Sequence, residues 1–208
     1  MADNDMRHRL AAADPAYGGE TLWYEYQDDD PSCRPMHRDG SWESLVVRTG
    51  YYDTFDFMRV EPSGGFYQRR LHFTDATAGG REDKPGTGLD PIWVAQEIGE
   101  TIATGLIYAA ALGYDKESTT LGFGFWWSGL KGRSLISAGS YLRMLPYQYK
   151  SMTSDVKTSI EVPLTTAPIS VAPFAIKAMR PLFAIFDGFS LDSVLAERQI
   201  KQRLERHP

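Results

Sequence analysis

The segment DPIWVAQEIGETIATGLIYAAALG, residues 90–113, carries the strongest signal for regular structure in the chain. Asp90 is typical of a helix N-cap, and Pro91 suits the first helical position. Apolar residues then recur with a helical period as far as Leu112, and Gly113 is typical of the residue that ends a helix. The segment therefore predicts a long helix with an apolar face, which needs a sheet or other helices to cover it.

Strands are predicted on both sides of this helix, from runs of β-formers and from alternating polar and apolar residues. They cover residues 21–27, 45–48, 51–60, 66–73, 119–127, 134–137, 141–145 and 155–164. Further helices are predicted at 167–186 and 191–205. This order predicts an α+β fold: a mainly antiparallel sheet of six to eight strands, covered on one face by about three helices. Residues 1–20 are expected to form a polar leader, and residues 21–208 a single domain.

The strand TTLGFGFWW, residues 119–127, has a glycine face. Gly122 and Gly124 point one way, whereas Phe123, Phe125 and Trp127 point the other. A glycine face on a strand indicates close approach of a helix, another backbone or a flat ligand. We expect a helix to pack there.

Composition excludes several classes of protein. The net charge of −5 and the pI of about 5.4 argue against a chain that binds nucleic acid or anionic membranes by electrostatics. Residues 1–10 lack the apolar core of a signal peptide, and no run of about 18 apolar residues predicts a membrane span. Cys33 is the only cysteine, which fits a reducing compartment, so we expect a cytoplasmic protein.

Motifs for catalysis are missing from the sequence. The four histidines are scattered, without metal-ligand spacing, and there is no Gly-x-Ser-x-Gly elbow. The Gly-rich stretch 79–88 lacks the spacing of a phosphate loop, and Pro85 removes an amide donor. We therefore expect no metal, no cofactor and no enzymatic activity.

Two groups of residues are candidates for ligand binding. In SGLKGR, residues 128–133, two glycines frame Lys131 and Arg133, which could hold an anion in a rigid turn. Arg70 and His72 share one face of the strand 66–73 and could form a polar binding stripe. Both groups also have a purely structural interpretation, as a glycine-stabilised hairpin and as a solvated sheet face.

The order of elements resembles an accessory domain found at the C-terminus of bacterial proteins that begin with a Schlafen-type AlbA_2 domain. The similarity spans roughly residues 45–205. It rests on FYQRRLHF (66–73), a helix spanning 98–113, the turn GLKGR (129–133), and RPLF with FDGF between 180 and 189. The AlbA_2 domain itself is not present, so ATP binding and nuclease activity are not implied. The resemblance implies a sensory or protein-contact role.

Three functions are open on these grounds. The first is a non-enzymatic regulatory or interaction module that contacts a protein partner, or a second copy of itself, through a sheet face or edge. The second is a sensor for a small anionic or nucleotide-like ligand, bound beside the glycine face. The third is an enzyme of unrecognised type. A flat apolar patch would favour the first. A deep pocket with converging polar groups would favour the second, and a strongly perturbed titratable group in that pocket would favour the third.

Overall fold

The computed structural model describes residues 8–10, 12–13, 36–48, 54–75, 85–137 and 149–205. In chain order the elements are β1 (Met36–Arg38), β2 (Ser41–Arg48), β3 (Thr54–Val60), β4 (Phe66–Arg70), η3 (Phe73–Asp75), β5 (Gly88–Leu89), α2 (Pro91–Ala111), β6 (Thr120–Trp127), β7 (Ser134–Leu135), β8 (Val156–Pro163), η4 (Pro168–Ser170), α3 (Ala172–Ala184) and α4 (Ser193–Glu205). The predicted strands at 21–27 and 141–145, and Cys33, lie outside the described residues.

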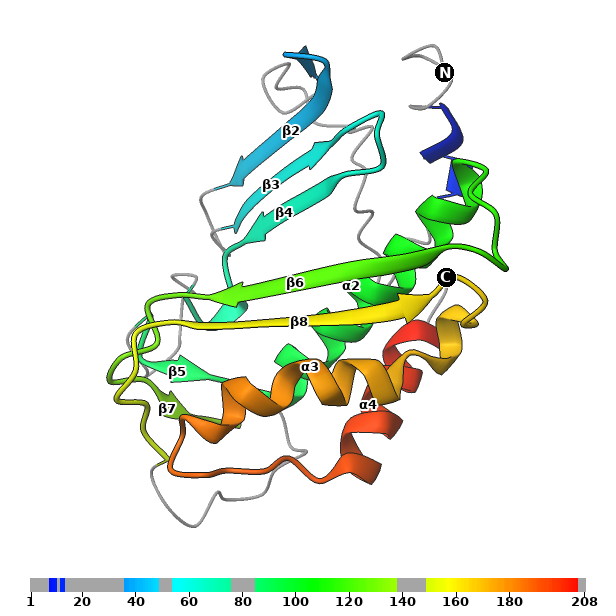
Figure 1. Ribbon diagram of the computed structural model, residues 1–208. Coiled ribbons are helices and arrows are strands. Elements are labelled where there is room, and N and C mark those ends of the chain that lie inside the picture. The colour runs from blue at the N-terminus through cyan, green and yellow to red at the C-terminus, as the bar shows by residue number, and fades with distance from the viewer. Residues whose placement is uncertain are drawn as a thin grey trace.

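The predicted α+β class is confirmed, but the described strands fall into three sheets instead of one. Strands β1 to β4 form a four-stranded antiparallel sheet in sequence order, β6 pairs with β8 antiparallel, and β5 pairs with β7 parallel. Figure 1 shows the four-stranded sheet and the β6–β8 pair side by side, with β4 and β6 as the facing strands. Strands β1 and β5 lie outside the predicted strands. Each has only two or three residues and exists through its pairing with a neighbouring strand.

Helix α2 begins and ends as its sequence predicts. The Asp90 side chain accepts hydrogen bonds from the backbone N–H groups of Ile92, at 2.8 Å, and Trp93, at 3.2 Å. Gly113 follows the helix with φ of +88°, a conformation that side-chain-bearing residues resist. The two ends of the helix are therefore set by Asp90 and Gly113, the residues from which the sequence predicted them.

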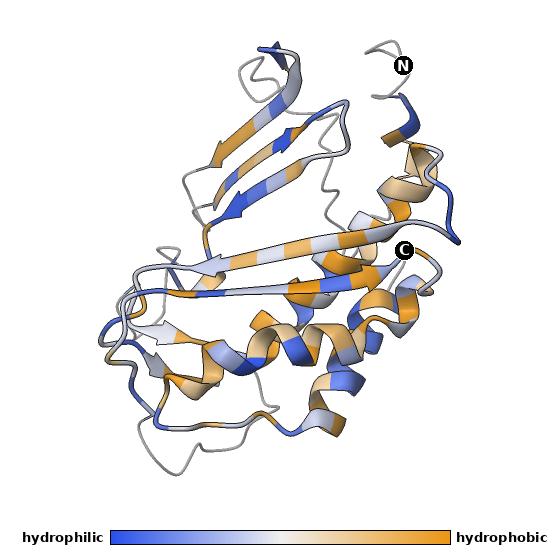
Figure 2. Cartoon of the chain, in the orientation of Figure 1, coloured by the Kyte–Doolittle hydropathy of each residue, from blue (hydrophilic) through white to orange (hydrophobic). Residues whose placement is uncertain are grey.

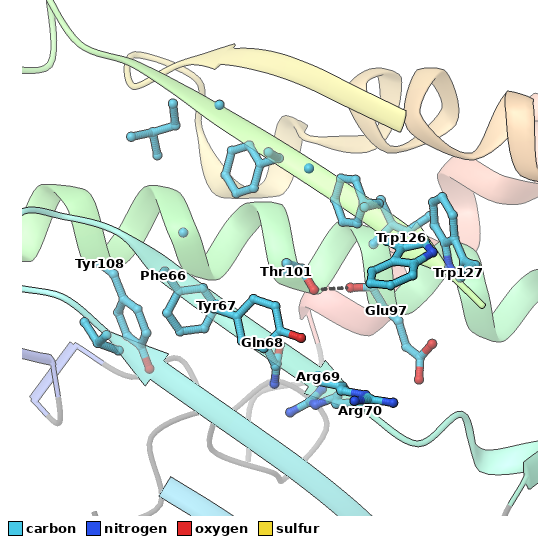
Figure 3. Close-up of a pocket in the computed structure, with 18 of the residues that line it drawn as sticks. Phe66, Tyr67, Gln68, Arg69, Arg70, Glu97, Thr101, Tyr108, Trp126 and Trp127 are labelled. Atoms are coloured by element: carbon cyan, nitrogen blue, oxygen red, sulfur yellow. Dashed lines mark hydrogen bonds between the residues drawn. The ribbon is translucent and has the colours of Figure 1, made fainter. Parts of the chain in front are cut away.

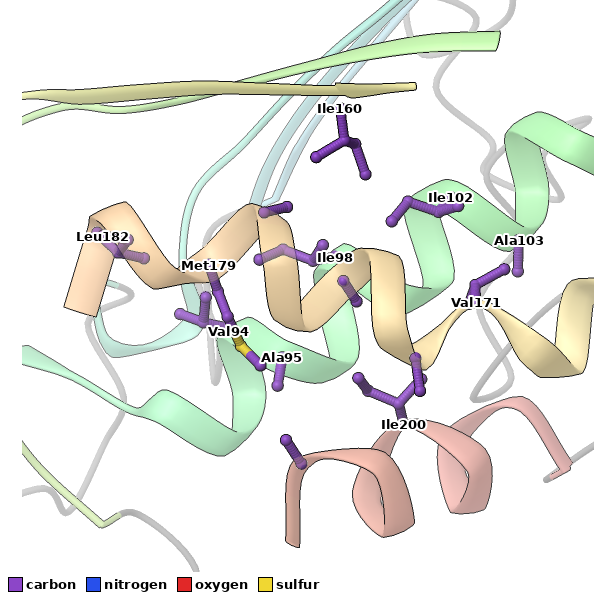
Figure 4. Packing of buried hydrophobic residues seen from close by; sticks show 14 of the residues in the cluster. Val94, Ala95, Ile98, Ile102, Ala103, Ile160, Val171, Met179, Leu182 and Ile200 are labelled. Carbon is purple, nitrogen blue, oxygen red and sulfur yellow. The ribbon is translucent and has the colours of Figure 1, made fainter. Parts of the chain in front are cut away.

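The main core lies between the β6–β8 pair and the three helices, all on one face of that pair (Figure 1). Figure 2 shows apolar residues along the facing sides of α2, α3 and β8, and Figure 4 shows how their side chains interlock. Ile102, Val162 and Ile200 are completely buried there. Gly99 permits the close approach of α4, because a Cβ at this position would lie 2.6 Å from Ile200.

Helix α2 also reaches beneath the four-stranded sheet. Near its C-terminal end Tyr108 is buried in a second, smaller cluster with Trp42, Met58 and Val60 from β2 and β3. The Tyr108 ring also lies edge-on to Phe66 of β4, with 6.2 Å between the ring centroids. One helix thus packs against both antiparallel sheets.

Candidate functional site: a groove between two strand edges

A large open groove runs between β4 and β6, with α2 as its floor (Figure 3). Its volume is about 1240 Å³. Aromatic side chains from both walls and from the floor line it: Phe66, Tyr67, Tyr108, Phe123, Phe125, Trp126 and Trp127. The polar residues of the groove, among them Gln68, Glu97 and Thr101, lie between these rings.

The edge of β6 presents backbone hydrogen-bonding groups to the groove. The N–H of Leu164 donates to the carbonyl of Thr119 at 3.0 Å, just before the strand. Because bonded and non-bonded pairs alternate in an antiparallel ladder, the odd-numbered residues of β6 bond to β8. The backbone groups of Gly122, Gly124 and Trp126 therefore point away from β8, into the groove.

The edge of β4 is arranged in the same way. Leu71 N–H donates to the carbonyl of Phe55 at 2.9 Å, which fixes the alternation along the β3–β4 ladder. The backbone groups of Phe66, Gln68 and Arg70 consequently face away from β3. Within the part of the chain that the structure describes, no strand pairs with either of these edges.

The expectation that a helix packs on the glycine face of β6 is wrong. Among the described residues, a Cβ added at Gly122 or Gly124 would meet nothing within 4 Å, so none of the described helices packs on this face. The close approach occurs instead on the opposite side of the strand, where a Cβ at Gly105 of α2 would lie 2.7 Å from the Phe123 ring. The glycines of β6 leave its backbone bare, and the glycine of α2 lets the strand approach the helix.

Glu97 lies on the floor of the groove, nearer the N-terminus of α2 than Tyr108. Its carboxylate accepts a hydrogen bond from the Trp93 indole N–H at 2.9 Å and lies 4.0 Å from Nε2 of His72. Burial raises the pKa of the Glu97 carboxyl to about 7, although the nearby guanidinium of Arg70 acts to lower it. Glu97 is therefore expected to titrate near neutral pH.

The raised pKa predicts a pH dependence of stability. Folded Glu97 binds a proton more tightly than the unfolded chain does, so the free energy of unfolding should fall as pH rises from about 4.5 to 7 and then level off. Glu97→Gln removes this titration. We expect the variant to be more stable than the wild type at pH 8 and to lose that advantage towards pH 4.5, as measured by urea unfolding at several pH values. Parallel pH profiles for the two proteins would contradict the prediction.

The groove brings together three of the four residues predicted to bind a ligand. Arg70, His72 and Arg133 line it, whereas Lys131 is exposed on the turn between β6 and β7. Arg70 Nε donates to Asp56 at 2.8 Å, across the β3–β4 ladder. His72 Nδ1 lies 2.7 Å from the Thr74 hydroxyl. The polar stripe on β4 thus forms part of one wall.

Arg133 makes its contacts with Asp75 and with backbone carbonyl groups. Its guanidinium binds both carboxylate oxygens of Asp75, with one of these bonds at 3.0 Å, and donates to the carbonyls of Gly129 at 2.8 Å and Gly88 at 3.3 Å. The side chain is 10% exposed. Arg133 ties η3 and β5 to the turn after β6, so its role in this geometry is structural, and Lys131 remains as a surface cation.

The edges of the groove, Glu97 and the aromatic lining were not singled out from the sequence as a binding site. Glu97 lies at the start of the helix, among residues assigned to the core. The glycine face of β6 was the sequence signal from which the unpaired edge of this strand could have been predicted. It was interpreted as a packing feature, because a sequence does not show which side of a strand stays open.

Comparisons of the chain with protein-family models, with curated proteins and with solved structures gave no match. The resemblance to the accessory domain of AlbA_2 proteins therefore stays a prediction.

None of the helices in the described segments has the length and apolar character to cross a membrane. Among residues 8–10, 12–13, 36–48, 54–75, 85–137 and 149–205, no three His, Cys, Asp or Glu side chains group as metal ligands.

Proposed function

We propose that this protein is a non-enzymatic interaction domain that binds an extended segment of a partner protein in the groove between β4 and β6. The observation that carries the proposal is the pair of strand edges that face the same groove with outward backbone groups. Exposed edges of this kind are templates for an added strand. Addition of a strand is a common mode of peptide recognition, in which main-chain hydrogen bonds supply affinity and alternate side chains supply specificity.

A segment in this groove would gain hydrogen bonds along both of its sides. Residues facing β4 would pair with Gln68 and Arg70, and the alternate residues would pair with Gly122 and Gly124. An antiparallel segment would join the four-stranded sheet to the β6–β8 pair, because β4 and β6 both run opposite to α2 (Figure 1). The result would be one continuous antiparallel sheet over the helices.

The aromatic lining of the groove supports the same function. Half-buried rings such as Phe123 and Phe125 lie on the inward side of β6 and contact the main core. An added strand would place every second side chain against them and remove apolar surface from water, worth roughly 25 cal/mol per Å². Backbone pairing and apolar burial would therefore act together.

Gly124 provides a direct test of backbone pairing. Its N–H points into the groove, so Gly124→Pro should leave the β6–β8 ladder intact but remove a donor from the edge. The probes are the acetylated peptide TKTVTFT and its counterpart with norleucine in place of lysine. We expect Gly124→Pro to weaken binding of both peptides about tenfold, measured by fluorescence anisotropy, which corresponds to one hydrogen bond at about 1.4 kcal/mol.

Gly124→Ala is the matched control. A Cβ at this position meets nothing within 4 Å, and the residue keeps its N–H, so binding should stay close to that of the wild type. Equal binding by the proline and alanine variants would show that the edge does not pair with the ligand. Failure of both peptides to bind the wild-type protein would contradict the proposal itself.

A second candidate function is an enzyme in which Glu97 acts as a general base, and the raised pKa of Glu97 beside His72 favours it. Such an enzyme would hold a small substrate over Glu97. Native mass spectrometry of freshly purified protein distinguishes the two. A retained small molecule that is lost in Glu97→Gln would favour the enzyme, whereas the interaction domain predicts none.

The sequence arguments are consistent with an interaction domain. The resemblance to an accessory domain implies a protein-contact role, and the single cysteine fits the cytoplasm as the compartment in which we propose that it acts. A homo-oligomer would arise if the added strand came from a second copy of the chain. Size-exclusion chromatography with light scattering measures the molar mass in solution and shows whether such an oligomer forms.

A further inference from the structure

The polarity of the groove suggests which segments it selects, on the condition that the proposed strand addition is correct. At one end Phe66, Tyr108 and Phe123 form an aromatic wall. Towards the other end lies the carboxylate of Glu97, and Trp127 of β6 lines the groove as well (Figure 3). A bound strand would therefore meet chemically different environments along its length.

The floor of the groove has the right repeat for a strand. Glu97, Thr101 and Gly105 of α2 all line it and follow one another at four-residue intervals. Four helical residues rise about 6 Å, whereas side chains on one face of a strand recur about every 6.7 Å. Three successive inward side chains of the ligand would thus lie over Glu97, Thr101 and Gly105 in turn.

Arg70 and Arg203, the two arginines whose charges act on Glu97, each have another carboxylate partner. Arg70 bonds to Asp56 at 2.8 Å, and Arg203 of α4 lies 3.4 Å from Glu100. Arg133 is bound to Asp75. Glu97 itself contacts the neutral indole N–H of Trp93 and, at 4.0 Å, the ring of His72.

We infer that the groove selects an extended segment that places a lysine or arginine side chain over Glu97 and a large apolar side chain four residues later, beside Phe123. The cation would form an ion pair with Glu97 on the side of β6 that carries Trp127, and aromatic rings favour cations over their faces. In an antiparallel complex the ligand runs in the direction of α2, so the basic residue comes first in its sequence.

This arrangement couples binding to protonation. Glu97 must be ionised to hold the cation, and its pKa of about 7 makes it mostly neutral at pH 6 and mostly ionised at pH 8. The charged and titratable groups that face it are Arg70 on β4, His72 after β4, Glu100 on α2 and Arg203 on α4. A histidine can also change charge in this range, so the control variant must keep His72.

The test compares TKTVTFT with its norleucine counterpart on the wild type and on Glu97→Gln, by fluorescence anisotropy at pH 6 and pH 8. At pH 8 we expect the wild type to bind the lysine peptide about tenfold more tightly than the norleucine peptide. This preference should shrink at pH 6. It should be absent in Glu97→Gln, which should bind the norleucine peptide as well as the wild type does.

A wild-type protein that binds both peptides equally at pH 8 would overturn the inference and leave strand addition standing. A lysine preference that persists in Glu97→Gln would also overturn it, because the cation would then be held elsewhere. Failure of the wild type to bind either peptide would contradict the proposed function and the inference together. Circular dichroism of Glu97→Gln at both pH values confirms that the variant is folded.

Discussion

Replacing Ile102 with aspartate is expected to unfold the protein at room temperature. Ile102 is completely buried in the middle of α2, within the core that joins this helix to α3, α4 and β8 (Figure 4). A carboxylate there would have to be desolvated without a partner or take up a proton, and its shorter side chain would also leave a cavity. We expect a loss of more than about 4 kcal/mol, close to the whole stability of an ordinary domain.

Val194→Asp is the matched control for this substitution. Val194 lies in the first turn of α4 with 64% of its surface exposed, and a negative charge near a helix N-terminus is favourable. Thermal unfolding followed by circular dichroism should show no cooperative transition for Ile102→Asp and a nearly unchanged midpoint for Val194→Asp. A soluble Ile102→Asp protein with the wild-type midpoint would contradict the packing of α2.

Arg133→Ala should destabilise the protein by about 3 kcal/mol, the usual cost of leaving one member of a buried ion pair without its partner. The substitution leaves the Asp75 carboxylate without its two bonds and removes donors from the carbonyls of Gly129 and Gly88. An anion site at Lys131 and Arg133 would instead tolerate loss of both cations with little change in stability. The observed contacts of Arg133 predict the opposite.

Lys131→Ala separates the two interpretations. This side chain is exposed on the same turn, so its removal should change the free energy of unfolding by less than about 0.5 kcal/mol. Combining Arg133→Ala with Asp75→Ala should cost less than the sum of the single changes, because the two residues are coupled. Additive effects in urea unfolding would show that the ion pair does not contribute.

Local features of the fold were predictable from the sequence, whereas long-range relations were not. The N-cap at Asp90, Pro91 and the terminating Gly113 specify α2, because caps depend on residues adjacent in the chain. The strand predicted at 155–164 likewise corresponds to β8. These signals need no knowledge of the rest of the molecule.

The pairing of strands and of ions depends on contacts that a local pattern does not encode. Arg133 was singled out as a candidate site residue, but its partner Asp75 lies 58 positions earlier in the chain. Similarly, β4 and β6 were both predicted as strands, yet nothing in their residues shows that a groove separates them. The candidate site is the groove between these two strands, and it exists because α2 packs against both sheets.

Residue-resolved amide hydrogen exchange, measured by NMR with and without TKTVTFT or its norleucine counterpart, tests strand addition most directly. In the free protein the N–H groups of Phe123 and Phe125 should already exchange slowly, because they bond to β8, whereas those of Gly122 and Gly124 should exchange fast. With saturating peptide the account predicts that exchange at Gly122, Gly124 and Gln68 slows markedly. Binding of the peptide without any slowing at these three amides would contradict it.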